Sequence, residues 1–133
     1  YSLFMSGTDK TMRIFKNAWF QRFARREKIA DGTLRDAIGR AEKGVVDADL
    51  GGNVIKQRVA RAGQGKSGGY RTIVVFRKGD RAFFVYGYAK SGQANIDRAE
   101  TEAFKKAARE LLALPDGQIR KLIENGALTE IKP

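Results

Sequence analysis

The stretch from residue 70 to residue 90 constrains the fold most, because it has the pattern of two strands joined by a tight turn. It runs YRTIVVFRK, then Gly79 and Asp80, then RAFFVYGYAK. β-Branched and aromatic residues dominate both runs, which is typical of strands, and the glycine–aspartate pair is typical of a hairpin loop. We therefore predict strands over 70–78 and 81–90 that pair antiparallel through a two-residue turn.

The register of this predicted hairpin follows from its turn. A two-residue turn pairs Lys78 with Arg81 and places Arg71 opposite Tyr88. Residues opposite each other share a face of the sheet, and so do residues two apart on one strand, so Lys90 joins Arg71 and Tyr88 on one face. A three-residue turn would break this register.

Helix signals precede the hairpin. Residues 12–16, MRIFK, read as a short strand, and Asn17 is placed to cap a helix after it. Thr33 and Asp36 resemble the capping box of a second helix that ends near Gly44. These two helices predict a helical hairpin at the amino end. Their apolar stripes are Trp19, Phe20, Phe23 and Ala24 in the first helix, and Leu34, Ala37, Ile38 and Ala41 in the second.

Another strand, about Val54 to Arg61, precedes the hairpin, and helices follow it. Asp97 and Glu100 form a capping box at the start of a long helix, and Pro115 separates that helix from a last one, which ends at Gly126. The residues predicted to face the core are Ala99, Ala103, Phe104, Ala107, Leu111 and Leu112 in the long helix, and Ile119, Leu122 and Ile123 in the last.

These elements predict an α+β fold, with a small, mainly antiparallel twisted sheet, an N-terminal helical hairpin and C-terminal helices. The chain has 133 residues, 42% of them hydrophobic, which suits one ordered domain over residues 12–133. The first eleven residues, YSLFMSGTDKT, have no periodic pattern. We expect them to be an N-terminal extension or a remnant of cloning, and disordered.

Net charge indicates the kind of partner. Lys and Arg number 26 against 15 Asp and Glu, a formal net charge of +11. A polyanion is the natural partner of such a chain, because neutralising phosphates releases condensed counterions. A solvated basic surface or an acidic protein partner is the alternative. We also see neither a run of about 18 apolar residues nor a signal peptide, which favours a cytoplasmic protein without membrane contact.

Histidine and cysteine are both absent from the sequence. Disulfides, zinc-finger sites, thiolate catalysis and histidine general bases are therefore excluded. Acid–base chemistry is left to Lys, Arg, Tyr, Asp and Glu, and we expect neither a metal nor another cofactor.

The stretch ARAGQGKSGGYR, residues 60–71, contains a loose phosphate-loop pattern that ends in Gly65, Lys66 and Ser67. A true phosphate loop leads into the N-terminus of a helix, whereas this one leads into a predicted strand. We therefore interpret it as a basic, glycine-rich connection. It either approaches a phosphate backbone closely or is a plain hairpin loop without a ligand.

Cationic side chains are predicted to gather on one face of the sheet. Lys56 and Arg58 are two residues apart, so they point the same way. If their face is that of Arg71, the sheet presents one cationic cluster in a single concavity, which has no hydrophobic purpose. The alternative is a set of solvated strand residues on an open face, which antiparallel sheets commonly have. Tyr86 and Tyr88 are either core aromatics or base-stacking platforms, and we expect Tyr86 to lie in the core. The predicted cluster comprises Lys56, Arg58, Arg71, Lys90 and Tyr88, with Lys66 above it, and Lys66, Arg61 and Tyr88 are the candidates for RNA binding.

The spaced pair Lys56 and Arg58, the run GKSGGYR and the YAKS segment after the hairpin resemble the RelE/HigB-like toxins of bacterial toxin–antitoxin pairs. The similarity spans about Met12 to Ile131. It implies a RelE-like fold and a metal-independent mRNA endonuclease that acts on ribosome-bound message. It also implies a cognate antitoxin, expected to be of the helix-turn-helix type.

Cleaving RNA without a metal requires a base for the 2′-hydroxyl, charge stabilisation at phosphorus and an acid for the leaving oxygen. We assign Lys56, assisted by Arg58, as or near the general base, and Arg71 as the clamp on the scissile phosphate. Lys90 neutralises developing charge or helps protonate the leaving oxygen, and Tyr88 stacks on a base or donates a proton. A gyrase-poisoning toxin of the same fold and a non-catalytic RNA-binding module remain the alternatives.

Overall fold

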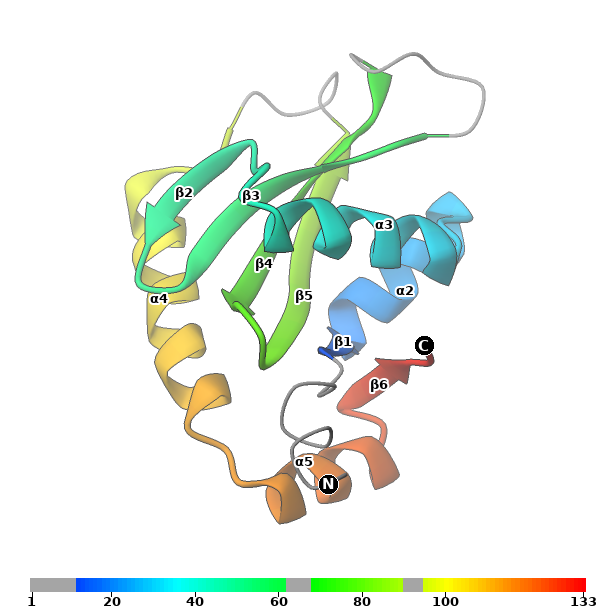
Figure 1. The fold of residues 1–133 in the computed structure, drawn as a ribbon, viewed down its shortest axis with the longest axis vertical. Coiled ribbons are helices and arrows are strands. Elements are labelled where there is room, and N and C mark those ends of the chain that lie inside the picture. The colour runs from blue at the N-terminus through cyan, green and yellow to red at the C-terminus, as the bar shows by residue number, and fades with distance from the viewer. Residues whose placement is uncertain (1–11, 62–67, 90–94) are drawn as a thin grey trace, which may run out of the picture.

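The computed structural model describes residues 12–61, 68–89 and 95–133, and over these the chain forms a six-stranded sheet with helices on both faces (Figure 1). The predicted extension 1–11 and the candidate residues Lys66 and Lys90 lie outside the described residues. In chain order the elements are β1 (Arg13–Asn17), α2 (Ala18–Glu27), α3 (Asp31–Glu42), β2 (Ala48–Gly51), β3 (Val54–Val59), β4 (Tyr70–Arg77), β5 (Arg81–Ala89), α4 (Arg98–Leu112), α5 (Asp116–Glu124) and β6 (Leu128–Ile131).

Strand order in the sheet is β2-β3-β4-β5-β1-β6. All neighbouring strands pair antiparallel except β1 and β5, which pair parallel. The sheet is thus mainly antiparallel, and the predicted α+β class is confirmed.

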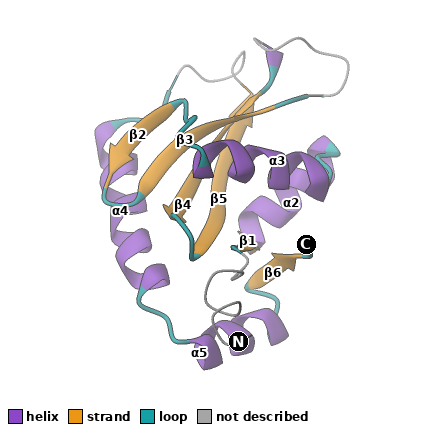
Figure 2. Cartoon of the chain, viewed as in Figure 1, coloured by secondary structure: helices purple, strands orange, loops and turns teal. Residues whose placement is uncertain are grey.

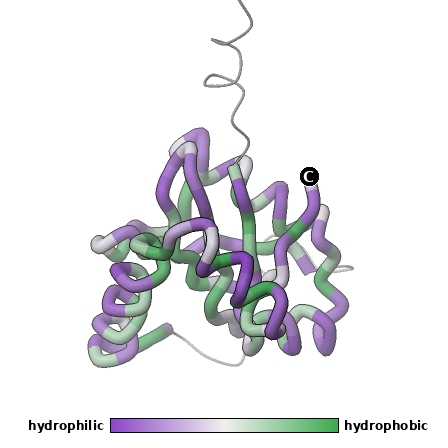
Figure 3. Tube along the Cα trace, turned by 90° about the horizontal axis from the view of Figure 1, so that it is seen from below, coloured by the Kyte–Doolittle hydropathy of each residue, from purple (hydrophilic) through white to green (hydrophobic). Residues whose placement is uncertain are grey.

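Two cores lie on the two faces of the sheet. Helices α2 and α3 cover one face, and α4 and α5 lie on the other (Figure 2). Hydrophobic stretches run through the strands, while the outer turns of the helices are hydrophilic (Figure 3). The first core includes Phe20, Phe23, Leu34, Ile38, Tyr70 and Phe84, and the second includes Phe15, Val54, Ile73, Val75, Phe83 and Ile119.

Helix α2 begins as predicted. The Asn17 side chain accepts a hydrogen bond of 2.8 Å from the Phe20 amide, which satisfies one free donor of the first turn. Phe20 is fully buried and its ring lies 5.0 Å from that of Phe84 on β5. The helix is therefore fixed to the sheet by its aromatic stripe.

Helix α3 begins earlier than predicted, so the capping box at Thr33 and Asp36 is wrong. Its N-cap is Ala30, and no side chain caps the first turn. Asp31 stands in that turn, where its charge suits the helix dipole, and it accepts a bond of 2.9 Å from buried Lys16. The predicted stripe Leu34, Ala37, Ile38 and Ala41 is buried. The N-terminal helical hairpin is matched only in part: the helices are consecutive, but their apolar stripes share one core with the sheet.

The capping box of α4 is confirmed, since Asp97 and Glu100 each accept a hydrogen bond from the other's amide. The predicted core face is partly wrong. Ala99 and Ala103 are exposed, whereas Ala108 is buried at 1% exposure. The helix is amphipathic, but its buried stripe is rotated toward Phe104, Ala108 and Leu111, at spacings of four and three residues.

Strands β2 and β6 were not predicted from the sequence. Each has four residues, ADLG and LTEI, too short to show a clear alternation. Both stand at the edges of the sheet, where short strands are common. The sheet is consequently two strands wider than the sequence indicated.

The hairpin turn differs from the prediction, but the register beyond it does not. Arg77 pairs with Arg81, so the connection has three residues rather than two. A bulge between Ile73 and Val74 then shifts the pairing by one residue. Arg71 consequently lies opposite Tyr88, as predicted, although the assumed turn is wrong.

Gly87 on β5 is required by the packing of α2. A Cβ atom at this position would stand 2.7 Å from the Phe23 ring and 3.2 Å from that of Phe20. We expect Gly87→Ala to lower the free energy of unfolding by about 1–3 kcal/mol, because overpacking forces buried groups apart. Gly39→Ala is the control: its Cβ would meet nothing within 4 Å in α3, and removing a helical glycine stabilises by up to about 1 kcal/mol. Urea unfolding of both variants measures the difference, and equal stabilities would contradict this account.

Candidate functional site

Two neighbouring rows of the sheet carry the predicted cluster. Arg58, Arg71 and Tyr88 lie directly opposite one another on β3, β4 and β5. One step along, Lys56 and Tyr86 flank Ile73 in the same way. Opposite residues, and residues two apart, share a face, so these side chains project from one face. We call Lys56, Arg58 and Arg71 the cationic cluster.

The cationic cluster lies on the face that α4 covers, beyond the apolar part of that face. Val54 and Val75, in the row below Lys56, belong to the core under α4 and α5. Lys56 donates a hydrogen bond of 3.3 Å from its ammonium to the Asn95 side chain, just before α4. The fold therefore places the cluster near the N-terminal end of α4, at the end of the sheet remote from the β4–β5 turn.

Exposure differs strongly within the cluster. The Arg58 side chain is 40% exposed, whereas that of Arg71 is only 7% exposed. Lys56 is half-buried. A ligand on this face would therefore meet Lys56 and Arg58 first, with Arg71 beneath them.

Asp47, just before β2, supplies a negative charge to the cluster. One of its carboxylate oxygens lies 3.3 Å from Nε of Arg71, and the other lies 3.8 Å from Nη2 of Arg58. The Asp47 side chain is 23% exposed. The carboxylate thus bridges the two guanidinium groups at the edge of the site.

In the row formed by Arg58, Arg71 and Tyr88, two polar atoms are buried without a hydrogen-bond partner in the described part of the chain. They are Nη1 of Arg71 and the hydroxyl oxygen of Tyr88. Burial is the main cause that raises the pKa of Tyr88; Arg71 opposes the rise and Asp47 adds to it. The phenol therefore stays protonated at neutral pH. It is a potential donor rather than a base.

Arg61 lies apart from the cationic cluster. Its guanidinium sits 5.5 Å from the centre of the Tyr70 ring. Tyr70 packs in the core on the α2 side, and its hydroxyl donates to Glu27 at 2.7 Å. Arg61 is therefore held toward the opposite face from Arg71. Its predicted contact with RNA stays a prediction, as do those of Lys66 and Lys90.

Tyr86 packs among other aromatic rings. Its ring lies 4.7 Å from that of Trp19 and 5.8 Å from that of Phe104 on α4. This arrangement agrees with the expectation that Tyr86 serves the core. Tyr88, whose ring is 6.1 Å from that of Tyr86, connects this aromatic group to Arg71.

Sequence reasoning missed Asp47, although a signal was present. Gly51 and Gly52 separate two short runs, and adjacent glycines are a hairpin signal. The β2–β3 hairpin that they form brings Asp47 to the end of β3, where its amide donates to the Lys56 carbonyl at 3.0 Å. A hairpin prediction at this point would have placed an acidic residue beside the cluster.

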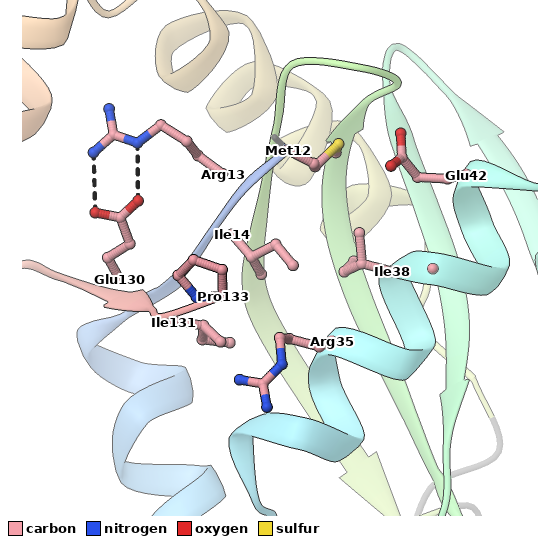
Figure 4. Close-up of a pocket in the computed structure, with 10 residues that line it drawn as sticks. Met12, Arg13, Ile14, Arg35, Ile38, Glu42, Glu130, Ile131 and Pro133 are labelled. Atoms are coloured by element: carbon pink, nitrogen blue, oxygen red, sulfur yellow. Dashed lines mark hydrogen bonds and ion pairs between the residues drawn. The ribbon is translucent and has the colours of Figure 1, made fainter. Parts of the chain in front are cut away.

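A hollow of about 440 Å³ lies at the other end of the molecule between α3 and the strands β1 and β6 (Figure 4). Its charged groups already have partners. Arg13 donates two hydrogen bonds to Glu130, at 2.9 and 3.0 Å, Arg35 donates to the Lys132 carbonyl, and Glu42 accepts from the Gly79 amide. Ile14, Ile38 and Ile131 also line it. This arrangement anchors the sheet to α3 and offers no converging cations.

The Arg13–Glu130 pair predicts a small acid sensitivity. Hydrogen bonding from Arg13 is the main cause that lowers the pKa of Glu130, so the pair stabilises the fold above the ordinary glutamate pKa and less as pH falls through the lowered value. We expect Glu130→Gln to cost less than about 1 kcal/mol at pH 7, because the Arg13 side chain is 38% exposed. The loss should shrink toward pH 3 in thermal unfolding scans. A difference that grows on acidification would contradict this sign.

Two further properties of the described residues bear on the site. No group of three or more acidic side chains gathers there as metal ligands would. None of the helices in the described ranges combines the length and the apolar composition that crossing a bilayer needs.

A comparison with protein families identifies a match that covers most of the chain. The model of the RelE toxin of the RelE/RelB toxin–antitoxin system matches residues 12–131, which include every element from β1 to β6. A search of curated proteins finds no match. The matched range contains the whole cationic cluster and Asp47.

Proposed function

The chain belongs to the RelE toxin family of toxin–antitoxin systems, and we propose that it is a metal-independent endoribonuclease that cuts messenger RNA on the ribosome. The observation that carries the proposal is the direct pairing of Arg58 with Arg71 and the position of Lys56 on the same face. Three cations with no apolar role suit one phosphodiester and its charged transition state.

The reaction that suits this cluster is an internal transesterification. The 2′-oxygen attacks phosphorus, the bond from phosphorus to the 5′-oxygen breaks, and a 2′,3′-cyclic phosphate forms. Lys56, in its uncharged amine form, accepts the 2′-hydroxyl proton and becomes an ammonium, and a proton donor protonates the departing 5′-oxygen.

The two arginines stabilise negative charge on the phosphate. Arg58, the more exposed of the two, meets the phosphate, and Arg71 stabilises the added negative charge from below. We propose that Tyr88, which stays protonated and lies in the same row, donates a hydrogen bond or a proton. Lys90 is proposed to neutralise the negative charge that develops in the transition state, or to help protonate the leaving oxygen.

Partners follow from the family and the charge. A toxin of such a system has an antitoxin as its partner, and a net charge of +11 suits an acidic antitoxin segment that folds on binding. We propose that this antitoxin is of the helix-turn-helix type. Message and ribosome are the proposed targets, which places the protein in the cytoplasm.

The proposal is tested with purified protein, treated with EDTA to remove metal and then desalted, on the same message with and without ribosomes in the magnesium buffer that ribosomes need. We expect cleavage on ribosomes and little or none of free message. Intact message in both, with loss of gyrase supercoiling in a parallel assay, would instead identify a gyrase poison. Salt-dependent RNA binding without scission would identify a non-catalytic binding module.

A further inference from the structure

Asp47 is the feature of the site that the proposed chemistry does not use. Neutralising a phosphate needs positive charge, yet this carboxylate stands between the two arginines. Its two oxygens address different guanidinium groups, as two oxygens of one phosphate would.

The contacts of Asp47 are longer than those of the tightest ion pairs in this protein, and similar in length to several exposed ones. They span 3.3 and 3.8 Å, and the described part of the chain shows no hydrogen bond between these groups. By contrast, Arg13 and Glu130 form two hydrogen bonds of 2.9 and 3.0 Å, and Lys16 bonds to Asp31 at 2.9 Å. Asp47 thus offsets part of the positive charge without fixing the arginines in a hydrogen-bonded geometry.

Arg71 is left with unused donor capacity by this arrangement. Its side chain is 7% exposed, and Nη1 is buried with no partner among the described residues. A buried guanidinium normally has its donors satisfied, and an unsatisfied one indicates a ligand or water that completes the site. Asp47 therefore offsets one of the two positive charges of Arg58 and Arg71, and the pair is still short of acceptor oxygens.

Resting on the proposed function, we propose that Asp47 is a displaceable counter-ion that occupies the phosphate position between Arg58 and Arg71. A phosphate of the RNA exchanges with the carboxylate, which turns toward solvent from its 23% exposed position. The free protein is stabilised by this internal anion. The cost of the exchange lowers its affinity for RNA phosphates that do not fill the site well.

The test compares Asp47→Asn with Asp49→Asn. Asp49 lies two residues further on, and its side chain accepts a hydrogen bond of 2.9 Å from the Gly51 amide. Each variant removes one negative charge, but only Asp47→Asn removes a carboxylate that contacts the cationic cluster. The probe is a short single-stranded oligonucleotide with 2′-O-methyl riboses, which cannot be cut by the proposed route. Fluorescence anisotropy gives its affinity at several salt concentrations.

We expect Asp47→Asn to bind the probe about tenfold more tightly than Asp49→Asn does. The slope of log affinity against log salt should be similar for the two variants, because the same phosphate contact forms in both. Equal affinities for the two variants, or weaker binding by Asp47→Asn, would overturn the inference, because Asp47 would then merely hold the arginines in place.

Two further readouts separate the possible failures. If the wild type cuts ribosome-bound message while the two variants bind the probe alike, the inference fails and the proposed function stands. If none of the three proteins binds the probe or cuts message, both fail.

Thermal unfolding checks the fold, and Asp47→Ser gives the same comparison if the asparagine variant does not fold. In the wild type, the Nε–H resonance of Arg71 should shift when the probe is added, and an unchanged resonance would also overturn the inference.

Discussion

Replacing Arg71 by alanine is expected to reduce the rate of message cleavage by about 10²–10³-fold, the loss typical of one transition-state charge stabiliser. Arg71 lies opposite Arg58 and Tyr88 at the centre of the row, and its side chain is 7% exposed. Its charge is consequently little screened by water, so its effect on a bound phosphodiester should be large. The measurement is single-turnover cleavage at saturating enzyme, which reports the chemical step.

Two comparisons keep the Arg71 result interpretable. Arg71→Lys keeps the charge but loses the planar fork, so it should restore only part of the rate. Arg109→Ala removes an exposed arginine from α4, well away from the row, and should leave the rate unchanged. A rate for Arg71→Ala equal to that of Arg109→Ala, with the fold intact by circular dichroism, would exclude Arg71 from the chemistry.

Replacing Lys56 is expected to have the second large effect, a loss of about 10²–10⁴-fold if its amine is the general base. Lys56 is half-buried and lies two residues from Arg58, on the same face of the sheet. Its side chain donates a hydrogen bond to Asn95. Lys56→Ala removes both charge and base, whereas Lys56→Arg keeps the charge on a group that does not release its proton. The two variants should therefore be about equally inactive in cleavage.

The arginine variant decides between two roles for Lys56. Recovery of most of the activity by Lys56→Arg would show that the position supplies charge alone, and another group would have to be the base. Lys106→Ala, which removes an exposed lysine of α4, is the control for lost positive charge. Its cleavage rate should match that of the wild type.

The row formed by Arg58, Arg71 and Tyr88 could be predicted from the sequence, because strand periodicity is a local property. Lys56 and Arg58 share a face on any strand, and alternation alone places Arg71 and Tyr88 on defined faces of theirs. The row was obtained, however, with the wrong turn: three residues connect β4 and β5, and the bulge at Ile73 and Val74 compensates. Bulges depend on twist and packing, which no local pattern in this hairpin reveals.

The environment of the row could not be predicted in the same way. The burial of Arg71 depends on which tertiary neighbours cover it, and Asp47 reaches it only through the β2–β3 hairpin, whose four-residue edge strand has no periodic signal. The start of helix α3 also depends on a long-range contact. No side chain caps its first turn, and Asp31 there accepts a hydrogen bond from Lys16 and places a negative charge at the positive end of the helix dipole. Long-range partners decided these cases.

The most direct test of the central claim is an end-group analysis of a ribosome-bound message after incubation with protein that has been stripped of metal by EDTA and desalted. The account predicts a cut that leaves a 2′,3′-cyclic phosphate or its 3′-phosphate product, and no cut where the ribose before the scissile phosphate is 2′-deoxy. Cleavage of the 2′-deoxy message at the same position, or a message left whole by folded protein, would contradict it.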